Sequence, residues 1–590
     1  MIPIPKQYSQ SILPKFNHYW LLFLGILTLY ALLTVPTINR LGISWDEEID
    51  LRIAQAYLTP RGFFFGIPLD LSQTRLPMFI VALVYRLFGV SDLLLARLTS
   101  VVIGGLTLLG IYIYGKDHFN HKVGLLAAGL LAVNPFFLSF ARLAFTESDV
   151  YLACTLTWLL VALARLQERR TIGRAAMAGL VLGLSISAKA TVLAVLPAVW
   201  AALYSVRFYT LNTRQNEVNI SGTTLIPARA GWFWAGWAVL VLLVGVYIAM
   251  FLDIGAYSGI FRTLNYGLVG LGWLLPLGWA YRHRNQYADS IPLAAFVTGF
   301  GLLTFVIFPP DHLTNSGILR SLFLRAENEM SFSAAFVGEV TALHLLTLFI
   351  KSTPLLGFAL LAGTVTSLAQ WSQRELTLPL FVALSYFAGL MLLPLGQTFY
   401  TIPILPVLSL LVADQFLRLW SFRRKIALMA AVFTMGWWGV EMVQCYPDYH
   451  LNGYQWLGAR PLFGRSSIGY RSVVYTPSDG VQQAVEWLNT NAEPGQTALL
   501  YVEPWHIVRY IAPDPGYTLT NGFDETLHSK PDFVVVHIGA ILWQGEGNDT
   551  PIGDVIRYPF NYEVLTREYE QVFVVQRAFN LEMASVWQRK

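Results

Sequence analysis

Charge is scarce in this chain. Only 13% of its 590 residues are charged, whereas a typical soluble protein carries roughly 25%. The chain is long enough for several soluble domains, but so few charged residues could not cover their surfaces. This composition excludes a disordered chain, a coiled coil and a nucleic-acid-binding module. The formal net charge of +4 is small for the length, so the distribution of the basic residues is more informative than their sum.

Cysteine is rarer still, with two residues in the whole chain. Cys154 lies within an apolar run and Cys445 follows the last of these runs. Two cysteines so far apart in the sequence predict neither a disulfide framework nor a metal site. We therefore interpret both as buried structural thiols.

Apolar residues, in contrast, are abundant. They make up 55% of the chain, and the mean hydropathy is +0.51. They occur in runs of about 17–25 residues, the length that a helix needs to cross a bilayer. The sequence predicts a polytopic α-helical membrane protein with about thirteen transmembrane helices. The predicted spans lie near residues 18–36, 95–114, 122–140, 148–165, 174–188, 190–206, 232–252, 263–280, 291–308, 354–370, 378–394, 398–414 and 425–441.

The basic residues favour one orientation of these spans. If the N-terminus lies in the cytoplasm, the basic loops fall on the cytoplasmic side, as the positive-inside rule requires. An odd number of spans then places the C-terminal region outside. The first apolar run lacks a small-residue cleavage signature, so we interpret it as a retained span and not as a signal peptide. The basic loop residues are Lys116, Lys122, Arg169, Arg170, Arg174, Arg207, Arg214, Arg229, Arg282, Arg284, Arg423, Arg424 and Lys425.

One further apolar run, residues 76–88 (LPMFIVALVYRLF), is too short for a span. Counting it as a span would invert every later loop and place the arginine-rich loops outside. The sequence therefore predicts a helix that lies on the outer face of the membrane. A similar surface helix is predicted over residues 340–350, before the span that Pro354 opens.

The composition changes from about Tyr446 onward, where Pro, Gly, Asp, Glu and Asn return. Strand-like runs occur at 497–502, 533–538 and 571–576, and an apolar face predicts a helix over 481–489. We predict a soluble extracytoplasmic α/β domain over residues 446–590. The transmembrane module is then residues 1–445, with an outer loop over 37–94. The C-terminal domain contains no phosphate loop, nucleophile elbow or zinc spacing.

Ionisable groups near the ends of the spans are the first candidates for chemistry, because charge is costly at membrane depth. The first outer loop contains Ser44-Trp45-Asp46-Glu47. Ser44 with Glu47 is a capping-box pattern, so a structural role explains Glu47 as well as a catalytic role does. Asp46 is less well explained in this way, since one helix cap does not need a second carboxylate.

Other ionisable residues gather on the outer side in this topology. Each alone is more often a solvated loop charge. Together they form a face with cations and carboxylates at the height of the lipid headgroups, and this suits a lipid that carries phosphate, because Lys and Arg bind phosphate through charge-assisted hydrogen bonds. The members of this set are Arg75, Arg142, Glu147, Lys189 and Lys351.

Several short motifs occur along the chain in a characteristic order. The chain resembles the lipid-carrier-dependent glycosyltransferases of the GT-C superfamily, and most of all the family 39-like enzymes, which include protein O-mannosyltransferases and the aminoarabinose transferases of lipid A. The resemblance covers about the first 440 residues. The motifs are Trp45-Asp46-Glu47, Arg75-Leu76-Pro77, Leu87-Phe88-Gly89, Ala96-Arg97-Leu98, Tyr114-Gly115, Asn134-Pro135 before Arg142, Lys351-Ser352-Thr353-Pro354 and Tyr400-Thr401-Ile402-Pro403-Ile404-Leu405-Pro406.

The chain departs from the family pattern at three positions. Glu147 stands where many relatives have Asp, and its longer side chain changes any contact with an acceptor or a metal. Arg75 replaces a frequent Lys, which keeps the charge but changes the geometry. Phe399 precedes Tyr400 where relatives commonly carry Arg, so one expected contact with the carrier phosphate is missing.

The resemblance implies transfer of a sugar from a polyprenyl-phosphate donor to an acceptor hydroxyl on the extracytoplasmic side, by inverting single displacement. Such a reaction needs one carboxylate to take the acceptor proton, and Asp46 is the candidate base, with Glu47 beside it. It also implies an integral protein of a bacterial inner membrane. No cofactor is implied with certainty; a divalent metal is left open, with Glu147 as a candidate ligand. The residues expected to bind the carrier phosphate or substrate are Arg75, Arg142, Glu147, Lys189, Lys351 and Tyr400.

Two other classes of function stay open from the sequence. A multi-span transporter or lipid flippase would place ionisable groups near the bilayer midplane, whereas the middles of these spans are almost free of charge. An inactive relative could present the C-terminal domain as a binding module, although Asp46 and the cations are retained. The C-terminal domain is expected to cover the outer cavity or to help select the acceptor, or to be purely structural. The sequence gives neither the sugar, the acceptor class nor the oligomeric state.

Overall fold

The computed structural model describes residues 18–40, 42–43, 45–59, 75–144, 149–169, 171–204, 295–296, 299–300, 334–370, 374–392, 398–451, 479–501, 515–521, 530–537, 562–580 and 582–590. Within them, five helical segments are long and apolar enough to cross a membrane, or six when one bent pair is counted as a span. The five are His18–Thr37, Leu93–His118, Asp149–Glu168, Phe399–Phe422 and Arg424–Cys445.

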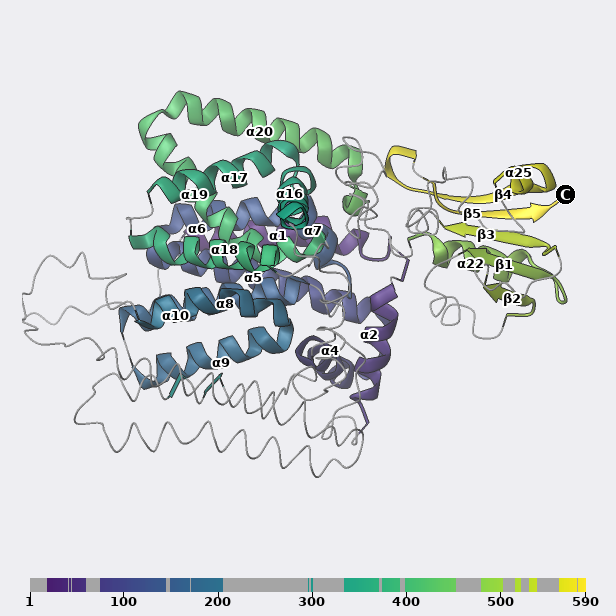
Figure 1. Cartoon of the computed structure of the whole chain (residues 1–590), viewed down its shortest axis with the longest axis horizontal. Helices are drawn as coiled ribbons and strands as arrows, with labels where there is room; N and C mark the ends of the chain where they lie inside the picture. The colour runs from purple at the N-terminus through teal and green to yellow at the C-terminus, as the bar shows by residue number, and fades with distance from the viewer. Residues whose placement is uncertain are drawn as a thin grey trace, which may run out of the picture.

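These helices lie side by side in one bundle with shorter apolar helices (Figure 1). The long ones are α1 (His18–Thr34, followed by η1, Val35–Thr37), α5 (Leu93–His118), α8 (Asp149–Glu168), α19 (Leu405–Phe422) and α20 (Arg424–Cys445). The shorter ones are α9 (Ile172–Ala188), η2 (Ala190–Val195), α10 (Leu196–Tyr204), α17 (Pro354–Ala369) and α18 (Arg374–Leu392). The helical membrane architecture is thus confirmed. The count of about thirteen spans stays a prediction, because those near 232–252, 263–280 and 291–308 fall almost wholly outside the described residues.

The predicted span near 122–140 is a bent pair. α6 (His121–Ala132) and α7 (Pro135–Ala141) meet at an angle of 68°. The bend falls at Asn134-Pro135, because a residue before proline avoids helical backbone angles and proline opens a new first turn. The Asn134 side chain caps α7 by accepting from the backbone N–H groups of Phe136 at 2.9 Å and Phe137 at 3.3 Å.

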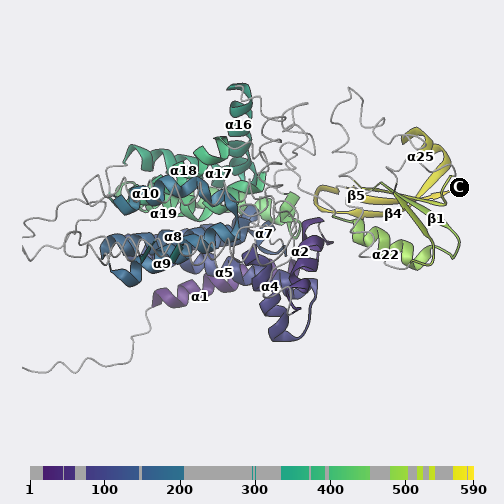
Figure 2. The same cartoon turned by 60° about the horizontal axis from the view of Figure 1, so that its bottom comes forward.

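Two helices lie across the end of the bundle. α4 (Arg75–Phe88) and α16 (Ala334–Lys351) are seen nearly end-on in Figure 1, whereas the bundle helices run across the view. Figure 2 shows α16 running across the direction of α17 and α18. These are the two helices that the sequence predicts as surface helices. α2 (Trp45–Ala56) packs beside α4 at the same end of the bundle.

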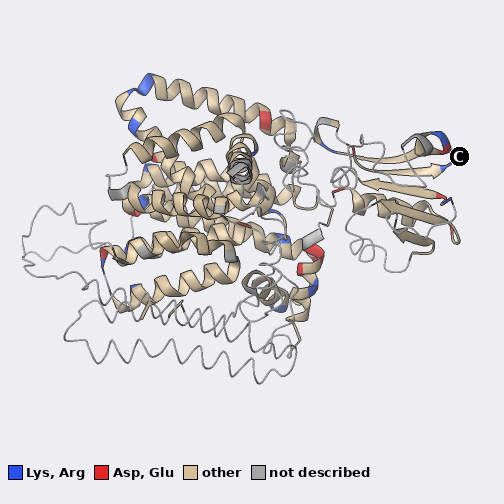
Figure 3. Cartoon of the chain, viewed as in Figure 1, with Lys and Arg blue, Asp and Glu red and all other residues tan. Residues whose placement is uncertain are grey.

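Basic residues collect at the opposite end. Figure 3 shows Lys and Arg at the end of the bundle that lies away from the C-terminal domain. There the ends of α5, α8 and α9 are joined by ion pairs, Arg165 to Asp117 at 3.2 Å and Arg174 to Glu168 at 3.2 Å. The two predicted cytoplasmic loops that follow α5 and α8 are therefore neighbours in space.

The described C-terminal residues form a five-stranded sheet in the order β2-β1-β3-β5-β4. β1 is parallel to β2 and β3, whereas β5 is antiparallel to β3 and β4. The elements are α22 (Val481–Asn491), β1 (Thr497–Tyr501), β2 (Thr518–Asn521), β3 (Phe533–His537), α25 (Tyr562–Glu568), β4 (Tyr569–Gln576) and β5 (Glu582–Arg589). The predicted helix and three strands are confirmed; β2, β5 and α25 are additional.

The sheet has a core on each face because successive strand side chains alternate. α22 packs Val485 and Leu488 against Leu500 and Val535. The opposite face carries a second cluster that includes Leu565 of α25. In the bundle, Cys154 and Cys445 are both buried free thiols, as predicted.

Candidate functional site

Those predicted site residues that the structure describes lie at the end of the bundle that faces the sheet. Asp46 is in the first turn of α2 and Arg75 begins α4, but the described structure does not include their side chains. Glu147 lies outside the described residues. The positions of Glu47, Arg142, Lys189, Lys351 and Tyr400 are described.

Glu47 is fully buried and bound on both carboxylate oxygens. Arg97 of α5 donates from Nε to Oε1 at 2.8 Å and from Nη2 to Oε2 at 2.7 Å. Oε1 also accepts from the backbone N–H of Ala144 at 2.6 Å. Such a forked pair fixes two groups in orientation as well as distance. Glu47 therefore ties the start of α2 to α5 and to the loop before α8.

Lys189 and Tyr400 come together although about 210 residues separate them in the sequence. Lys189 follows the last residue of α9, and its Nζ lies 4.4 Å from the ring centroid of Tyr400 and 5.2 Å from that of Phe399, both in η4 (Thr398–Ile404). The same Nζ bonds to Asp149 Oδ2 at 3.1 Å. The aromatic rings and the carboxylate thus hold a cation whose side chain is 12% exposed.

Tyr386 of α18 fixes η4 in place. Its hydroxyl donates to the backbone carbonyl of Tyr400 at 3.0 Å and lies 3.5 Å from Thr191 Oγ1. The Lys189 environment is therefore built from α8, α9, η2, α18 and η4.

Asp149 is the functional residue that the sequence reasoning missed. It is fully buried at the first position of α8 and pairs with Lys189. An acidic residue in the first turn of a helix is common for structural reasons alone, so no signal in the local sequence distinguishes Asp149.

Lys351 is buried at the end of α16, with 4% of its surface exposed. Burial lowers the pKa of its ammonium group to about 7. The next residue, Ser352, accepts from Asn134 Nδ2 at 3.0 Å. The Asn134-Pro135 and Lys351-Ser352-Thr353-Pro354 motifs, far apart in sequence, are thus joined by one hydrogen bond.

Arg142 follows α7 and is fully buried. Its Nη1 donates to the carbonyl of Pro447 at 2.6 Å and lies 3.4 Å from that of Thr37. The guanidinium carbon stands 4.8 Å from the ring centroid of Tyr449. Nε and Nη2 have no hydrogen-bond partner among the described residues. Burial lowers the pKa of this guanidinium to about 10, which leaves it charged at neutral pH.

The described residues contain no group of three or more His, Cys, Asp or Glu side chains that could hold a metal ion. The candidate ligand Glu147 is not among them, so a metal role for Glu147 stays a prediction.

Part of the chain is similar to a known family. Residues 72–234 match the family model described as dolichyl-phosphate-mannose-protein mannosyltransferase. The match bears out, for this segment, the resemblance to the GT-C glycosyltransferases that the ordered motifs indicate. The matching segment includes Arg75, Arg142, Glu147 and Lys189. No curated protein matches the chain in sequence.

Two solved structures show a distant likeness to this chain, with TM-scores below 0.5. ArnT from Cupriavidus metallidurans bound to undecaprenyl phosphate is 14% identical, with a TM-score of 0.46 over 97% of this chain and 98% of that one. The oligosaccharyltransferase of Archaeoglobus fulgidus tethered with an acceptor peptide is 10% identical, with a TM-score of 0.43 over 98% of this chain and 74% of that one. Identities this low transfer no residue roles, so the roles proposed below depend on the geometry of this chain.

Proposed function

We propose that the chain is a membrane glycosyltransferase that moves a sugar from a polyprenyl-phosphate donor to an acceptor hydroxyl on the extracytoplasmic face. The observation that carries the proposal is a set of three cations largely shielded from solvent at helix ends, Lys189 after α9, Lys351 at the end of α16 and Arg142 after α7, in a chain whose residues 72–234 match a mannosyltransferase family. Buried or half-buried cations at a membrane face suit a phosphate leaving group.

The proposed reaction is a single displacement. The acceptor oxygen attacks the anomeric carbon from the face opposite the phosphate, and the bond between that carbon and the phosphate oxygen breaks. The electron pair stays on the phosphate, where Lys189 and Lys351 stabilise the added charge, together with Arg75 in its predicted role. The acceptor proton passes to the Asp46 carboxylate. The anomeric configuration is inverted.

Asp46 is proposed as the base in preference to its neighbour. Both oxygens of Glu47 accept hydrogen bonds from Arg97, and one also binds the Ala144 N–H. A carboxylate whose two oxygens are both bound in this way is not free to contact an acceptor hydroxyl. We propose that Glu47 positions the first turn of α2, whereas Asp46 acts on the acceptor.

A transfer assay in proteoliposomes tests this function. Purified protein and the variant Asp46→Asn are given radiolabelled polyprenyl-phosphate sugars, with a membrane extract as acceptor. We expect wild type to release label from one donor, and Asp46→Asn to lower turnover by about 10²- to 10⁴-fold. Glu48→Gln, on the same helix, is the control that retains turnover.

The other outcomes are also decisive. Near-normal turnover by Asp46→Asn would remove Asp46 from the role of base. Wild type that transfers no label, but carries lipid or solute across the liposome membrane, would replace the proposal with the transporter or flippase.

A further inference from the structure

The segment that joins the first span to α2 is held by its main chain from the bundle side. We call residues 37–40 and 42–43 the connecting segment. Arg97 donates from Nη1 to the carbonyl of Ile38 and from Nη2 to that of Gly42, each at 2.7 Å. Arg97 also binds Glu47, so one buried guanidinium binds both the connecting segment and the helix that follows it, α2.

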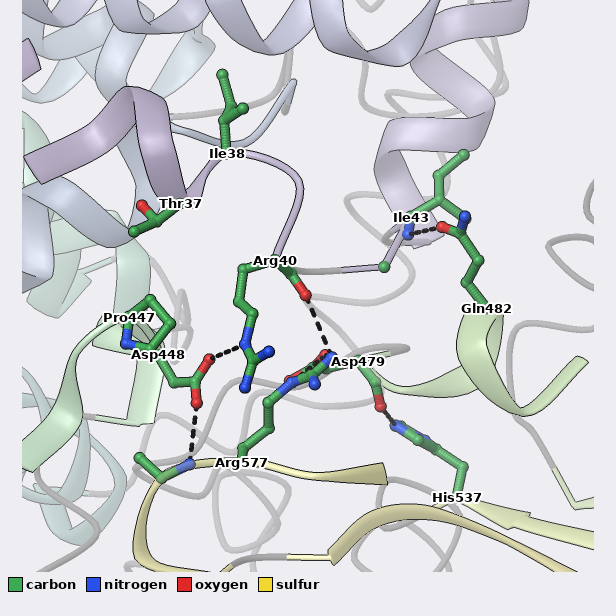
Figure 4. Close-up of polar contacts among 12 residues, drawn as sticks. Thr37, Ile38, Arg40, Ile43, Pro447, Asp448, Asp479, Gln482, His537 and Arg577 are labelled. Atoms are coloured by element: carbon green, nitrogen blue, oxygen red, sulfur yellow. Dashed lines mark hydrogen bonds and ion pairs between the residues drawn. The ribbon is translucent and has the colours of Figure 1, made fainter. Parts of the chain in front are cut away.

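The C-terminal domain holds the same segment from the other side (Figure 4). Arg577 Nη2 donates to the carbonyl of Arg40 at 3.3 Å. The backbone N–H of Ile43 donates to Gln482 Oε1 of α22 at 3.2 Å. A Cβ added at Gly42 would lie 3.3 Å from Gln482 Cβ, which shows how closely the segment lies against α22.

Arg577 is itself fixed by a buried ion pair. Its Nη2 lies 2.7 Å from Asp479 Oδ1, and its Nε lies 3.1 Å from both carboxylate oxygens. The two side chains are only 4% and 5% exposed. His537 Nε2 of β3 lies 3.0 Å from the Asp479 carbonyl, which links this residue to the sheet. The Arg577 guanidinium, which donates to the Arg40 carbonyl, is therefore fixed in position.

A second contact supports the first. Asp448, just after the last span, accepts from the Ala578 N–H at 2.9 Å and lies 3.5 Å from Arg40 Nε (Figure 4). Arg40 is thus held by its main chain to Arg577 and by its side chain to Asp448.

The position of these contacts relative to α2 gives them their importance. Ile43 is two residues before the start of α2, and Asp46 is the second residue of that helix. A shift of the connecting segment therefore moves the first turn, and a displacement of about 1 Å at a reacting group can cost about 10²-fold in rate.

We infer that Arg577 is a positioning residue: held by Asp479, it acts through the main chain of Arg40 to fix the first turn of α2 over the membrane face. Gln482 acts with it through Ile43. The inference rests on the proposed function in that Asp46 is the group positioned. It gives the C-terminal domain a role in turnover that is separate from selecting an acceptor.

Two variants and a matched control test the inference in the full-length protein. Arg577→Lys keeps the charge beside Asp479 but loses the planar fork that reaches both Asp479 and Arg40. Gln482→Ala removes the hydrogen bond from the Ile43 N–H and an exposed one to Glu486, without leaving a buried charge. Arg589→Lys is the control, because Arg589 pairs with Asp532 at 2.8 Å in the same domain, and no described contact joins it to the connecting segment.

The first readout separates turnover from donor binding. Both variants should lower kcat about tenfold and leave the KM for the polyprenyl-phosphate donor within about twofold of wild type. The control should match wild type in both constants. A kcat unchanged in Gln482→Ala and Arg577→Lys would overturn the inference.

The second readout does not depend on activity. Hydrogen–deuterium exchange followed by mass spectrometry of peptides over residues 42–56 should be about tenfold faster in both variants than in wild type and in Arg589→Lys. Exchange equal to wild type would overturn the inference even if a transferase activity is found. If wild type transfers no sugar, the proposed function fails, and the exchange rates still decide whether Arg577 and Gln482 hold α2. If Arg577→Lys does not fold, Gln482→Ala alone decides.

Discussion

Arg97 and Glu47 form an ion pair with side chains only 1% and 0% exposed. Removing one member of such a pair leaves a buried charge without its partner, a much larger cost than the pair itself contributes. Nearby on α2, Glu48 pairs with Arg52, whose side chain is 60% exposed. The two acids stand next to each other in the sequence, so they make a matched comparison.

We expect Glu47→Gln to lower the free energy of unfolding by about 3–5 kcal/mol, because Arg97 keeps its charge and loses its counterion. Glu48→Gln should cost less than about 1 kcal/mol, because water screens Arg52. Thermal unfolding in detergent measures both. Equal costs would show that burial of the Arg97 pair does not determine stability.

Lys351 gives the site a dependence on pH. Burial lowers its pKa to about 7, and a lysine carries its proton below its pKa. The charge that would bind phosphate is therefore present at pH 6 and largely lost at pH 8.5. We expect the KM for the donor to rise about tenfold across this interval. In Lys351→Arg, where the group stays charged, the rise should disappear; a profile identical to wild type would assign it to another group.

The residues of the site differ in whether the sequence alone could predict them. Lys189 and Tyr400 could be predicted, because a cation and a family motif at span ends are local signals. Asp149 could not, since nothing in its neighbours shows that it turns toward Lys189. The pairing of Glu47 with Arg97 was hidden for the same reason: it depends on how α2 crosses α5, a property of packing and not of either segment alone.

Among the elements, the break between α6 and α7 has the clearest consequence. Asn134 caps α7 and also donates to Ser352 in another part of the bundle. Asn120 caps α6 by accepting from the N–H groups of Lys122 at 2.9 Å and Val123 at 3.0 Å, and its side chain makes no described hydrogen bond to another element.

We expect Asn134→Ala to destabilise the protein by about 2–4 kcal/mol, because it loses a cap and leaves the buried Ser352 without its donor. Asn120→Ala should cost about 1 kcal/mol, the ordinary value of a cap. Unfolding midpoints of the two variants provide the measurement. If the costs are the same, the bond to Ser352 contributes nothing to holding the two motifs together.

The elements that could be predicted are those with a local signal. Long apolar runs predict helices because the bilayer sets their length. The helix α22 could be predicted because its apolar residues recur at helical spacing. β2 is four residues long and reads Thr-Leu-Thr-Asn, too short to distinguish from a loop. β5 (Glu-Met-Ala-Ser-Val-Trp-Gln-Arg) has no regular alternation, because helices cover both faces of the sheet in its middle.

At the scale of the whole molecule, the end of the last span and the residues after it act as one unit. Beyond α20, Pro447 accepts from the buried Arg142, and the Tyr449 hydroxyl donates to the carbonyl of Leu33 at 3.2 Å. These contacts belong to the bundle, although the change in composition predicts a domain boundary at residue 446.

Two truncated chains test this arrangement. A chain ending at Leu451 should keep the contacts of Pro447 and Tyr449, whereas a chain ending at Cys445 should lose them and leave Arg142 without its main acceptor. We expect the shorter chain to be less stable by about 3 kcal/mol or more. Thermal unfolding in detergent compares them, and equal midpoints would place the boundary at 446 after all.

The contact between Arg577 and Arg40 joins residues that are 537 positions apart. During synthesis, the ribosome makes Arg40 and α2 early and reaches Arg577 only after nearly all of the chain. For most of its synthesis, a nascent chain therefore has the contacts of Arg97 with the connecting segment but not those of the C-terminal domain. Both sets of contacts are present only after the sheet has formed, so we expect a chain that ends before Arg577 to insert its bundle without this hold on α2.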